Sequence, residues 1–163
     1  MLGTVTSYEH LACDAANTDL GAAAAYELWD VLSPVKSCAD SRQDLARYEM
    51  SLFRFPLAQR QLLAAMEYLK SVEAEGHEGY FASAASFGFA DAMACFEAMG
   101  RKDVVANLMA AHLAYSQPSA LVVGGDSIAK SELGGFDSAL AAVNPIADLY
   151  RFVRLNQLEF VSW

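Results

Sequence analysis

The sequence predicts an all-α fold, a single-domain helical bundle of about six to eight helices. Apolar residues make up 55% of the 163 residues and charged residues only 19%, below the usual share of about a quarter, so the chain can bury a sizeable core. Apolar side chains recur at helical spacing in several segments, and no strand-like alternation of any length occurs. Scarce proline and abundant alanine also favour helices.

The N-terminal part of the chain is expected to hold two helical regions. Residues 6–32 form the first, in one or two pieces. Ser33-Pro34 is expected to end it, because the residue before proline avoids the helical conformation. Apolar residues at helical spacing then predict a helix over Leu45–Phe53. All of 1–163 is expected to form one domain.

A long helix from Leu57 to about Ala74 is the clearest element in the sequence. Pro56 suits its first turn, where a missing N–H costs nothing. Gly76 is placed to terminate it. Its apolar face consists of Leu62, Leu63, Met66, Leu69 and Val72.

Three more segments complete the predicted fold. Helices are expected over 91–100, where Gly100 ends the pattern, and from 104 to the proline at 118. Residues 120–136 contain two glycine pairs and read as a loop with a short helical or extended insert. Asn144-Pro145 is expected to cap and start a final helix that extends to Phe160.

The charge of the chain is unevenly distributed. The net charge is −9, and residues 1–35 and 71–100 each hold five acids with no Lys or Arg. Direct binding to nucleic acid or to an anionic membrane needs clustered bases, so both are excluded, whereas a basic protein partner is favoured. Ordinary solubility is the alternative reason for mild acidity. Candidates for one acidic face are Asp14, Asp19, Glu27, Glu73 and Glu75.

Cysteine and histidine spacing predicts neither a disulfide framework nor a metal site. Cys13, Cys38 and Cys95 are far apart and include no CxxC motif. His10 and Cys13 share the spacing of two ligands on one helix face, but no second pair completes a zinc site. No cofactor is expected. The sequence shows no signal-peptide pattern and no membrane-spanning run, so a cytoplasmic location is expected.

The segment Gly76–Phe81 carries the candidate binding residues. His77 and Glu78 would point about 100° apart on a regular helix, but the flanking glycines allow a turn in which both converge. Alternatively, His77 satisfies backbone groups at a helix end and Glu78 sits in the next first turn. Tyr80 and Phe81 belong to an aromatic-rich stretch that is expected to be mainly core, with one or two rings left for an interface. No catalytic constellation is present.

With these residues in view, the chain resembles the bacterial domain-of-unknown-function family that includes DNA mimic protein nineteen. The resemblance rests on Gly76-His77-Glu78-Gly79-Tyr80-Phe81 and on Asp91-Ala92-Met93-x-x-Phe96-x-x-Met99-Gly100, and it covers roughly 40–160. Family amides are replaced here by Ala74-Glu75, Gly79 and Ser83, whereas the glycine and aromatic skeleton remains.

The resemblance implies an all-α homodimer without established catalysis, whose namesake presents an acidic surface to a DNA-binding transcription factor in place of DNA. An acidic interaction protein is therefore expected. An immunity or antitoxin-like protein that blocks a toxin stays open as an alternative. So does a small-ligand binder or enzyme that uses a pocket formed by His77, Glu78 and Tyr80.

Overall fold

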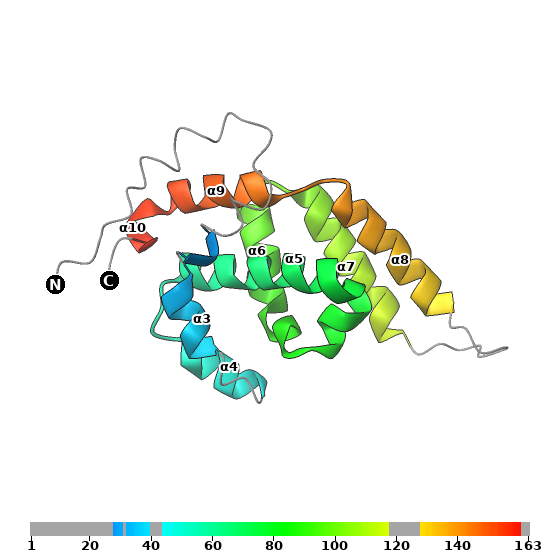
Figure 1. The fold of residues 1–163 in the computed structure, drawn as a ribbon, viewed down its shortest axis with the longest axis horizontal. Coiled ribbons are helices and arrows are strands. Elements are labelled where there is room, and N and C mark those ends of the chain that lie inside the picture. Colours follow the sequence, from blue (N-terminus) through cyan, green and yellow to red (C-terminus); the bar gives the residue numbers. More distant parts are fainter. Residues whose placement is uncertain (1–27, 31, 40–43, 118–127, 161–163) are drawn as a thin grey trace.

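The regular elements of the structure are helices throughout the part of the chain that it describes. The computed structural model describes residues 28–30, 32–39, 44–117 and 128–160 (Figure 1). In chain order the elements are α3 (Ser33–Ala39), α4 (Leu45–Leu52), α5 (Leu57–Ala82), the 3₁₀ helix η2 (Ala84–Gly88), α6 (Phe89–Ala98), α7 (Lys102–Ser116), α8 (Ile128–Ala141), α9 (Ile146–Leu155) and α10 (Gln157–Phe160). The predicted all-α class is confirmed.

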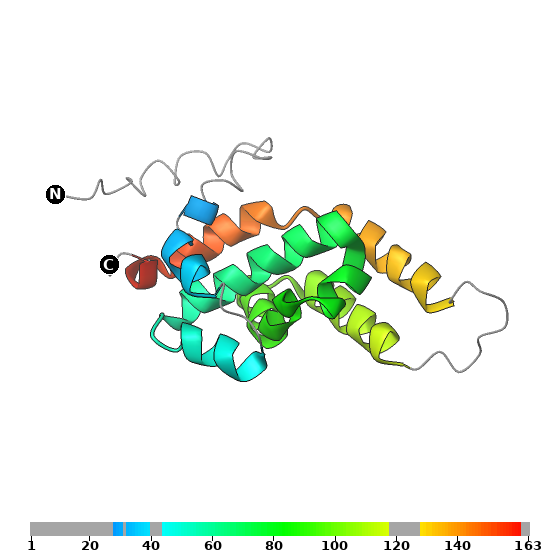
Figure 2. The same ribbon diagram turned by 60° about the horizontal axis from the view of Figure 1, so that its bottom comes forward.

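Helix α5 runs through the middle of the molecule. Helices α3 and α10 pack near its N-terminal half, and η2, α6 and α8 contact it more extensively. Figure 2 shows α9 alongside α5, with α7 and α8 side by side at the far end. The consecutive residues Leu62–Ala65 are completely buried, so the middle of α5 is covered on every side. The turn formed by residues 62–65 is apolar on every side, as expected of a helical segment that is buried all round.

Helix α3 was not predicted. Residues 28–30 are helical and Leu32 lies in a turn, so a helix does end ahead of Ser33-Pro34, but a new one begins at Ser33 with Pro34 as its second residue. Proline is tolerated in the first turn, where its missing N–H has no intrahelical partner. Helix α4 agrees with the prediction to within one residue, and the side chain of Asp44 accepts a hydrogen bond from the backbone N–H of Arg47 at its start.

Glycine ends or interrupts the chain's helices at two predicted places. After α6, Gly100 adopts a positive φ of 73°, which L residues rarely adopt, and the helix stops as expected. At Gly76 the helical path also breaks, with φ 70° and ψ 179°, but a new helical run starts at once. The helix predicted from Leu57 to about Ala74 therefore does end at Gly76, and a second helical run follows it directly across a kink, so that α5 extends to Ala82.

The C-terminal part corrects two further predictions. Gly134 and Gly135, expected in a loop, lie inside α8, which packs against α5 and α7 and so overcomes the low helix propensity of glycine. Asn144 makes no side-chain cap and adopts a positive φ of 32° ahead of α9. The final helix is also divided in two, because α9 ends at Leu155 and α10 starts at Gln157.

None of the helices that the structure describes combines the length and the apolar character that crossing a membrane requires. The predicted segment 6–32 lies almost entirely outside the described residues, as does the glycine pair at 124–125.

Candidate functional site

The kink in α5 is shaped around a carboxylate from α8. A Cβ built on Gly76 would lie 2.7 Å from Oδ2 of Asp137, closer than side-chain carbons approach oxygen. The φ and ψ of Gly76 also fall in a region that is essentially restricted to glycine. Both the backbone conformation and the space beside it therefore require glycine at this position.

His77 is held by three hydrogen bonds directly after the kink. Oδ1 of Asp137 accepts from the backbone N–H of His77 at 2.8 Å and lies 2.5 Å from Nδ1 of its ring. The other ring nitrogen, Nε2, lies 2.8 Å from the hydroxyl of Tyr68. A carboxylate can only accept, so the neutral ring carries its proton on Nδ1, and Nε2 accepts from the Tyr68 hydroxyl. We call His77, Tyr68 and Asp137 the His77 cluster.

Burial sets the protonation of this cluster. The side chain of His77 is completely buried, and this burial lowers the pKa of its imidazole, although the hydrogen bond to Asp137 and the charge of that carboxylate oppose the shift. Burial also raises the pKa of Tyr68 above its ordinary value, opposed by a hydrogen bond with Asn107. Both groups are therefore neutral at pH 7, and the cluster is a structural tie between α5 and α8.

The aromatic surroundings keep water away from the imidazole. The ring of His77 lies 5.6 Å from that of Tyr68, 6.1 Å from that of Phe81 and 6.4 Å from that of Phe136, measured between centroids. Asn107 of α7 also donates to the backbone carbonyl of Phe136. The cluster therefore connects α5, α7 and α8.

The four candidate binding residues of the sequence do not share one surface. His77 and Tyr80 are completely buried, Phe81 is half-buried and Glu78 is exposed. Burial raises the pKa of Tyr80, and its hydroxyl finds no hydrogen-bond partner among the described residues. The kink aims the backbone N–H and ring of His77 at Asp137, and Glu78 lies at the surface. Of the three residues considered for a shared pocket, His77 and Tyr80 are therefore closed off from the surface.

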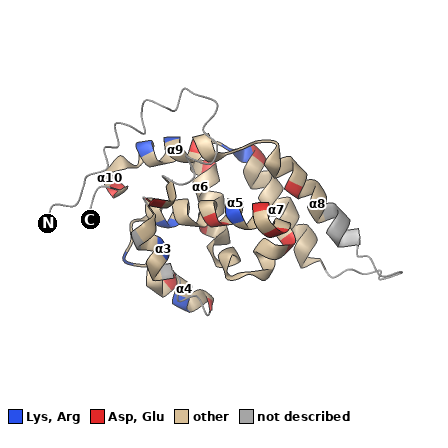
Figure 3. Ribbon diagram, viewed as in Figure 1, with Lys and Arg blue, Asp and Glu red and all other residues tan. Residues whose placement is uncertain are grey.

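The acidic candidates divide between described and undescribed parts of the chain. Glu73 and Glu75 are exposed in the second half of α5. Figure 3 shows acidic residues in the part of α5 beside α7 and α8. Asp14, Asp19 and Glu27 lie outside the described residues, as do His10 and Cys13.

Metal-binding chemistry finds no support in the described residues. No group of three or more His, Cys, Asp or Glu side chains that could hold a metal ion occurs among them. Cys38 is half-buried beside the guanidinium of Arg54, and Cys95 is buried as a free thiol in the core.

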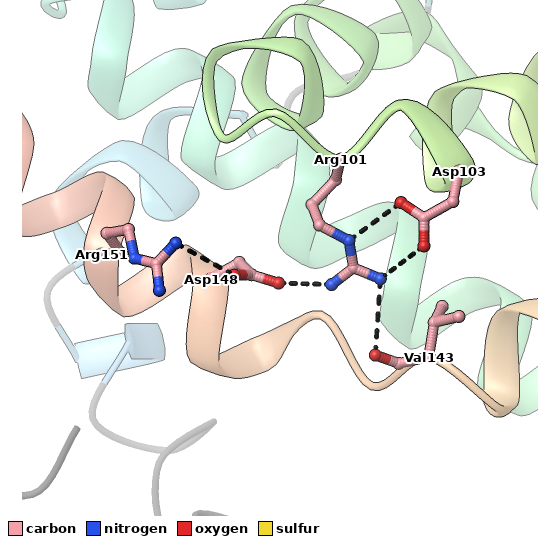
Figure 4. Close-up of polar contacts among 5 residues, drawn as sticks. All are labelled: Arg101, Asp103, Val143, Asp148 and Arg151. Atoms are coloured by element: carbon pink, nitrogen blue, oxygen red, sulfur yellow. Dashed lines mark hydrogen bonds and ion pairs between the residues drawn. The ribbon is translucent and has the colours of Figure 1, made fainter. Parts of the chain in front are cut away.

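A second polar cluster joins α9 to the corner between α6 and α7 (Figure 4). Arg101 makes two hydrogen bonds to Asp103, at 2.9 and 2.8 Å, and a further charged hydrogen bond to Asp148 of α9. Arg151 lies 3.9 Å from the same Asp148 carboxylate. The hydrogen bonds to Arg101 lower the pKa of Asp103 to about 2. Arg101 thus links segments that lie 47 residues apart.

Sequence reasoning missed the partners that give His77 its role. Asp137 lies 60 residues away, directly after the segment 120–136 that was expected to be a loop, and Tyr68 reads as an ordinary helix residue. The one available signal was Gly76 before a histidine. This pair indicated an unusual backbone conformation but did not indicate which residue contacts it.

The family model described as DMP19-like protein matches residues 54–156, more than half of the chain. The chain belongs to the DMP19-like protein family. The match spans α5 to α9 and includes the kink, the His77 cluster and the Arg101 cluster. The resemblance seen in the sequence is thereby confirmed. No curated protein and no solved structure matches the chain significantly.

Proposed function

We propose that this DMP19-like protein is a non-enzymatic interaction protein that engages a basic, DNA-binding protein through the acidic second half of α5. Membership of the family supports this, because its namesake presents acidic surface in place of DNA. The observation that carries the proposal is local: Glu73, Glu75 and Glu78 are all exposed, and residues 71–100 contain no Lys or Arg. An acidic surface without bases attracts and steers cationic partners.

The internal polar contacts narrow the set of acids available to a partner. Asp91 pairs with Arg60, Asp103 and Asp148 pair with Arg101, and Asp137 binds His77. By contrast, no ion pair of Glu73 or Glu75 with a described residue is found. The surface of α5 beyond Lys70 is therefore the best-supported contact region.

A capture experiment with matched variants tests the proposal. The native protein is used as bait in a lysate at ~0.1 and ~0.5 M salt, because exposed charge–charge attraction is strongly screened at the higher value. The test variant combines Glu73→Gln, Glu75→Gln and Glu78→Gln. The control combines Asp30→Asn, Glu49→Gln and Glu97→Gln, which removes the same charge from exposed positions on other helices.

We expect a basic protein that is captured at low salt, released at high salt, displaced by added duplex DNA and lost only with the test variant. Equal capture by both variants would refute the proposal that the partner binds the α5 surface. A captured protein that DNA does not displace would favour the toxin-blocking alternative. The ligand-binding alternative has less support, because both ring nitrogens of His77 already have partners and the ring is completely buried.

We also propose that the chain forms a homodimer, as the family resemblance implies, and that it is cytoplasmic, as expected from the sequence. Large apolar residues at the surface support an interface with a second copy: Phe53 is 84% exposed, Leu155 71% and Leu158 86%. Light scattering should give twice the chain mass. The variant Leu158→Glu should shift the protein toward the monomer, and an unchanged mass would argue against this interface.

A further inference from the structure

The side chain of Glu75 fills the space beside Gly79, in the second helical run of α5. A Cβ built on Gly79 would lie 2.3 Å from the Cβ of Glu75, 3.4 Å from its Cγ and 2.8 Å from its carboxylate oxygen Oε2. Atoms from both ends of one side chain therefore surround the place that a side chain at position 79 would occupy. Glu75 can be folded back in this way only because residue 79 is glycine.

This contact results from the kink in α5 and does not occur in a regular helix. Residues four apart on an α-helix have their Cβ atoms about 5–6 Å apart, so alanine would fit beside a glutamate there. At Gly76 the backbone leaves the helical path, and the Cβ of Glu75 comes to lie 2.3 Å from the place of a Cβ on Gly79. Asp137 holds the kink through the backbone N–H and the ring of His77. The position of the Glu75 side chain is thus set by contacts inside the fold.

The carboxylate of Glu75 is held in place and is still accessible to a partner. Glu75 is exposed, and its carboxylate makes no hydrogen bond or ion pair with any residue that the structure describes. An exposed glutamate normally has many side-chain conformations and loses this freedom when it forms an ion pair. Packing against Gly79 removes part of this freedom before a partner binds, so Glu75 loses less entropy on binding.

We infer that Gly79 is a positioning residue for the partner contact, because it lets the Glu75 carboxylate lie in the orientation that a cationic side chain of the partner binds. This inference rests on the proposed function and assigns the leading contact within the acidic second half of α5 to Glu75. Gly79 acts only through Glu75 and does not itself contact the partner. A side chain at position 79 therefore displaces the Glu75 carboxylate without changing any charge.

Binding of a basic peptide to variants that keep the charge of the surface tests the inference. The probe is a fluorescent peptide that alternates lysine with serine, and its affinity for the full chain is measured by anisotropy at ~0.1 M salt. Glu75→Asp keeps the carboxylate but shortens the side chain, and Glu73→Asp is the matched control at an exposed position ahead of the kink. Gly79→Ala fills the space beside Glu75. Its control is Gly134→Ala, where nothing lies within 4 Å of the added carbon.

Loss of one exposed ion pair weakens binding by about two- to fivefold, so we expect this decrease for Glu75→Gln, for Glu75→Asp and for Gly79→Ala. Glu73→Asp and Gly134→Ala should bind the peptide as the wild type does. In the double variant that combines Gly79→Ala with Glu75→Gln, the alanine should cause no further loss, because no carboxylate is left to position.

Wild-type affinity of Glu75→Asp, or an equal decrease in Glu73→Asp, overturns the inference. A loss caused by Gly79→Ala that is equally large without the Glu75 carboxylate also overturns it, because the effect would then come from the fold. Circular dichroism verifies folding, and if Gly79→Ala does not fold, the comparison of Glu75→Asp with Glu73→Asp decides alone.

The triple glutamine variant of Glu73, Glu75 and Glu78 tests the proposed function separately. If this variant binds the peptide as the wild type does, the acidic surface itself is refuted. If it binds more weakly while Glu75→Asp binds normally, the acidic surface stands and only the role of Gly79 is refuted.

Discussion

At the scale of single residues, Gly76 and His77 act as one receptor for a carboxylate. Gly76 leaves room for Asp137, and His77 supplies two N–H donors to the same oxygen. The sequence marked this site through its glycines but gave no indication of the partner. A contact between residues far apart in sequence depends on how α8 packs on α5, and no local pattern encodes that packing.

Replacing Gly76 by alanine should destabilise the protein by about 2–3 kcal/mol. The backbone conformation at this position costs roughly 1–3 kcal/mol for any residue but glycine, and the new methyl group meets a carboxylate that is already bound. Urea denaturation measures the free energy of unfolding. Gly134→Ala and Gly135→Ala serve as controls and should stabilise by about 0.5–1 kcal/mol, because both lie in α8 with open space around the added carbon. Equal effects at all three positions would contradict the role assigned to Gly76.

His77 should make stability depend on pH on the acidic side of neutrality. Its folded pKa lies below the unfolded value of about 6.5, so the unfolded chain binds more protons as the pH falls. The contribution of His77 is complete above that pH. Below it, the free energy of unfolding should decrease by up to about 1.4 kcal/mol per pH unit until the folded pKa is reached.

Unfolding experiments between pH 5 and 8 on the wild type and on His77→Gln isolate this dependence from that of the other two histidines. The difference between the two proteins should flatten above about pH 6.5. If His77→Gln does not fold, NMR of the wild-type imidazole supplies the answer, and a ring that is already protonated at pH 6.5 would refute the assignment.

At the scale of elements, α5 depends on contacts from distant helices at both its beginning and its kink. At the beginning, Oε2 of Glu159 in α10 accepts from the backbone N–H of Ala58 at 2.9 Å. The side chain of Gln59 donates to the Glu159 carbonyl. The acceptor for the first turn thus comes from about a hundred residues away, which is why Pro56 could be recognised from the sequence but the capping group could not.

Helix ends were predicted correctly where the local side-chain pattern determines them. They were predicted incorrectly where contacts with distant helices determine them. The pattern from Leu62 to Val72 identified α5, and Gly100 correctly ended α6. Gly76 also ends the first helical run of α5, but the second run that starts at once was not expected, because it depends on Asp137, which accepts from the backbone N–H of His77. Helix α8 was missed because its two glycines read as a loop.

Glu159→Ala should destabilise the protein by about 1 kcal/mol, because it removes an acceptor and a favourable negative charge from the start of α5. Thermal or urea unfolding measures the change. Gln157→Ala is the matched control in the same helix: its side chain is exposed, so we expect a change within about 0.5 kcal/mol. A larger effect at Gln157 than at Glu159 would contradict the capping role assigned to Glu159.

At the scale of the whole molecule, each of the three C-terminal helices is fastened by one carboxylate. Asp137 ties α8 to α5, Asp148 ties α9 to Arg101, and Glu159 ties α10 to the start of α5. These acids are engaged inside the fold, so the chain's 20 Asp and Glu residues overstate the number of carboxylates that a partner can contact. The exposed acids of α5 matter more to the proposed function than the total charge does.

The contact that holds α9 against the corner between α6 and α7 should require arginine, and not only a positive charge, at position 101. The side chain of Arg101 is only 18% exposed, and its guanidinium bonds to Asp103 and Asp148 at the same time. Lysine carries the same charge but cannot reproduce two directed contacts, so Arg101→Lys should destabilise by about 1–2 kcal/mol.

A double-mutant cycle of Arg101→Lys with Asp148→Asn separates this tie from general electrostatics, because only residues in contact show a coupling energy. We expect a coupling of at least about 0.5 kcal/mol in the free energy of unfolding for this pair. The matched pair Arg101→Lys with Glu49→Gln should show none, because Glu49 is an exposed acid on α4. Additive effects in both pairs would mean that α9 is held by its buried apolar face, including Leu149 and Phe152, and that Arg101 contributes only through Asp103.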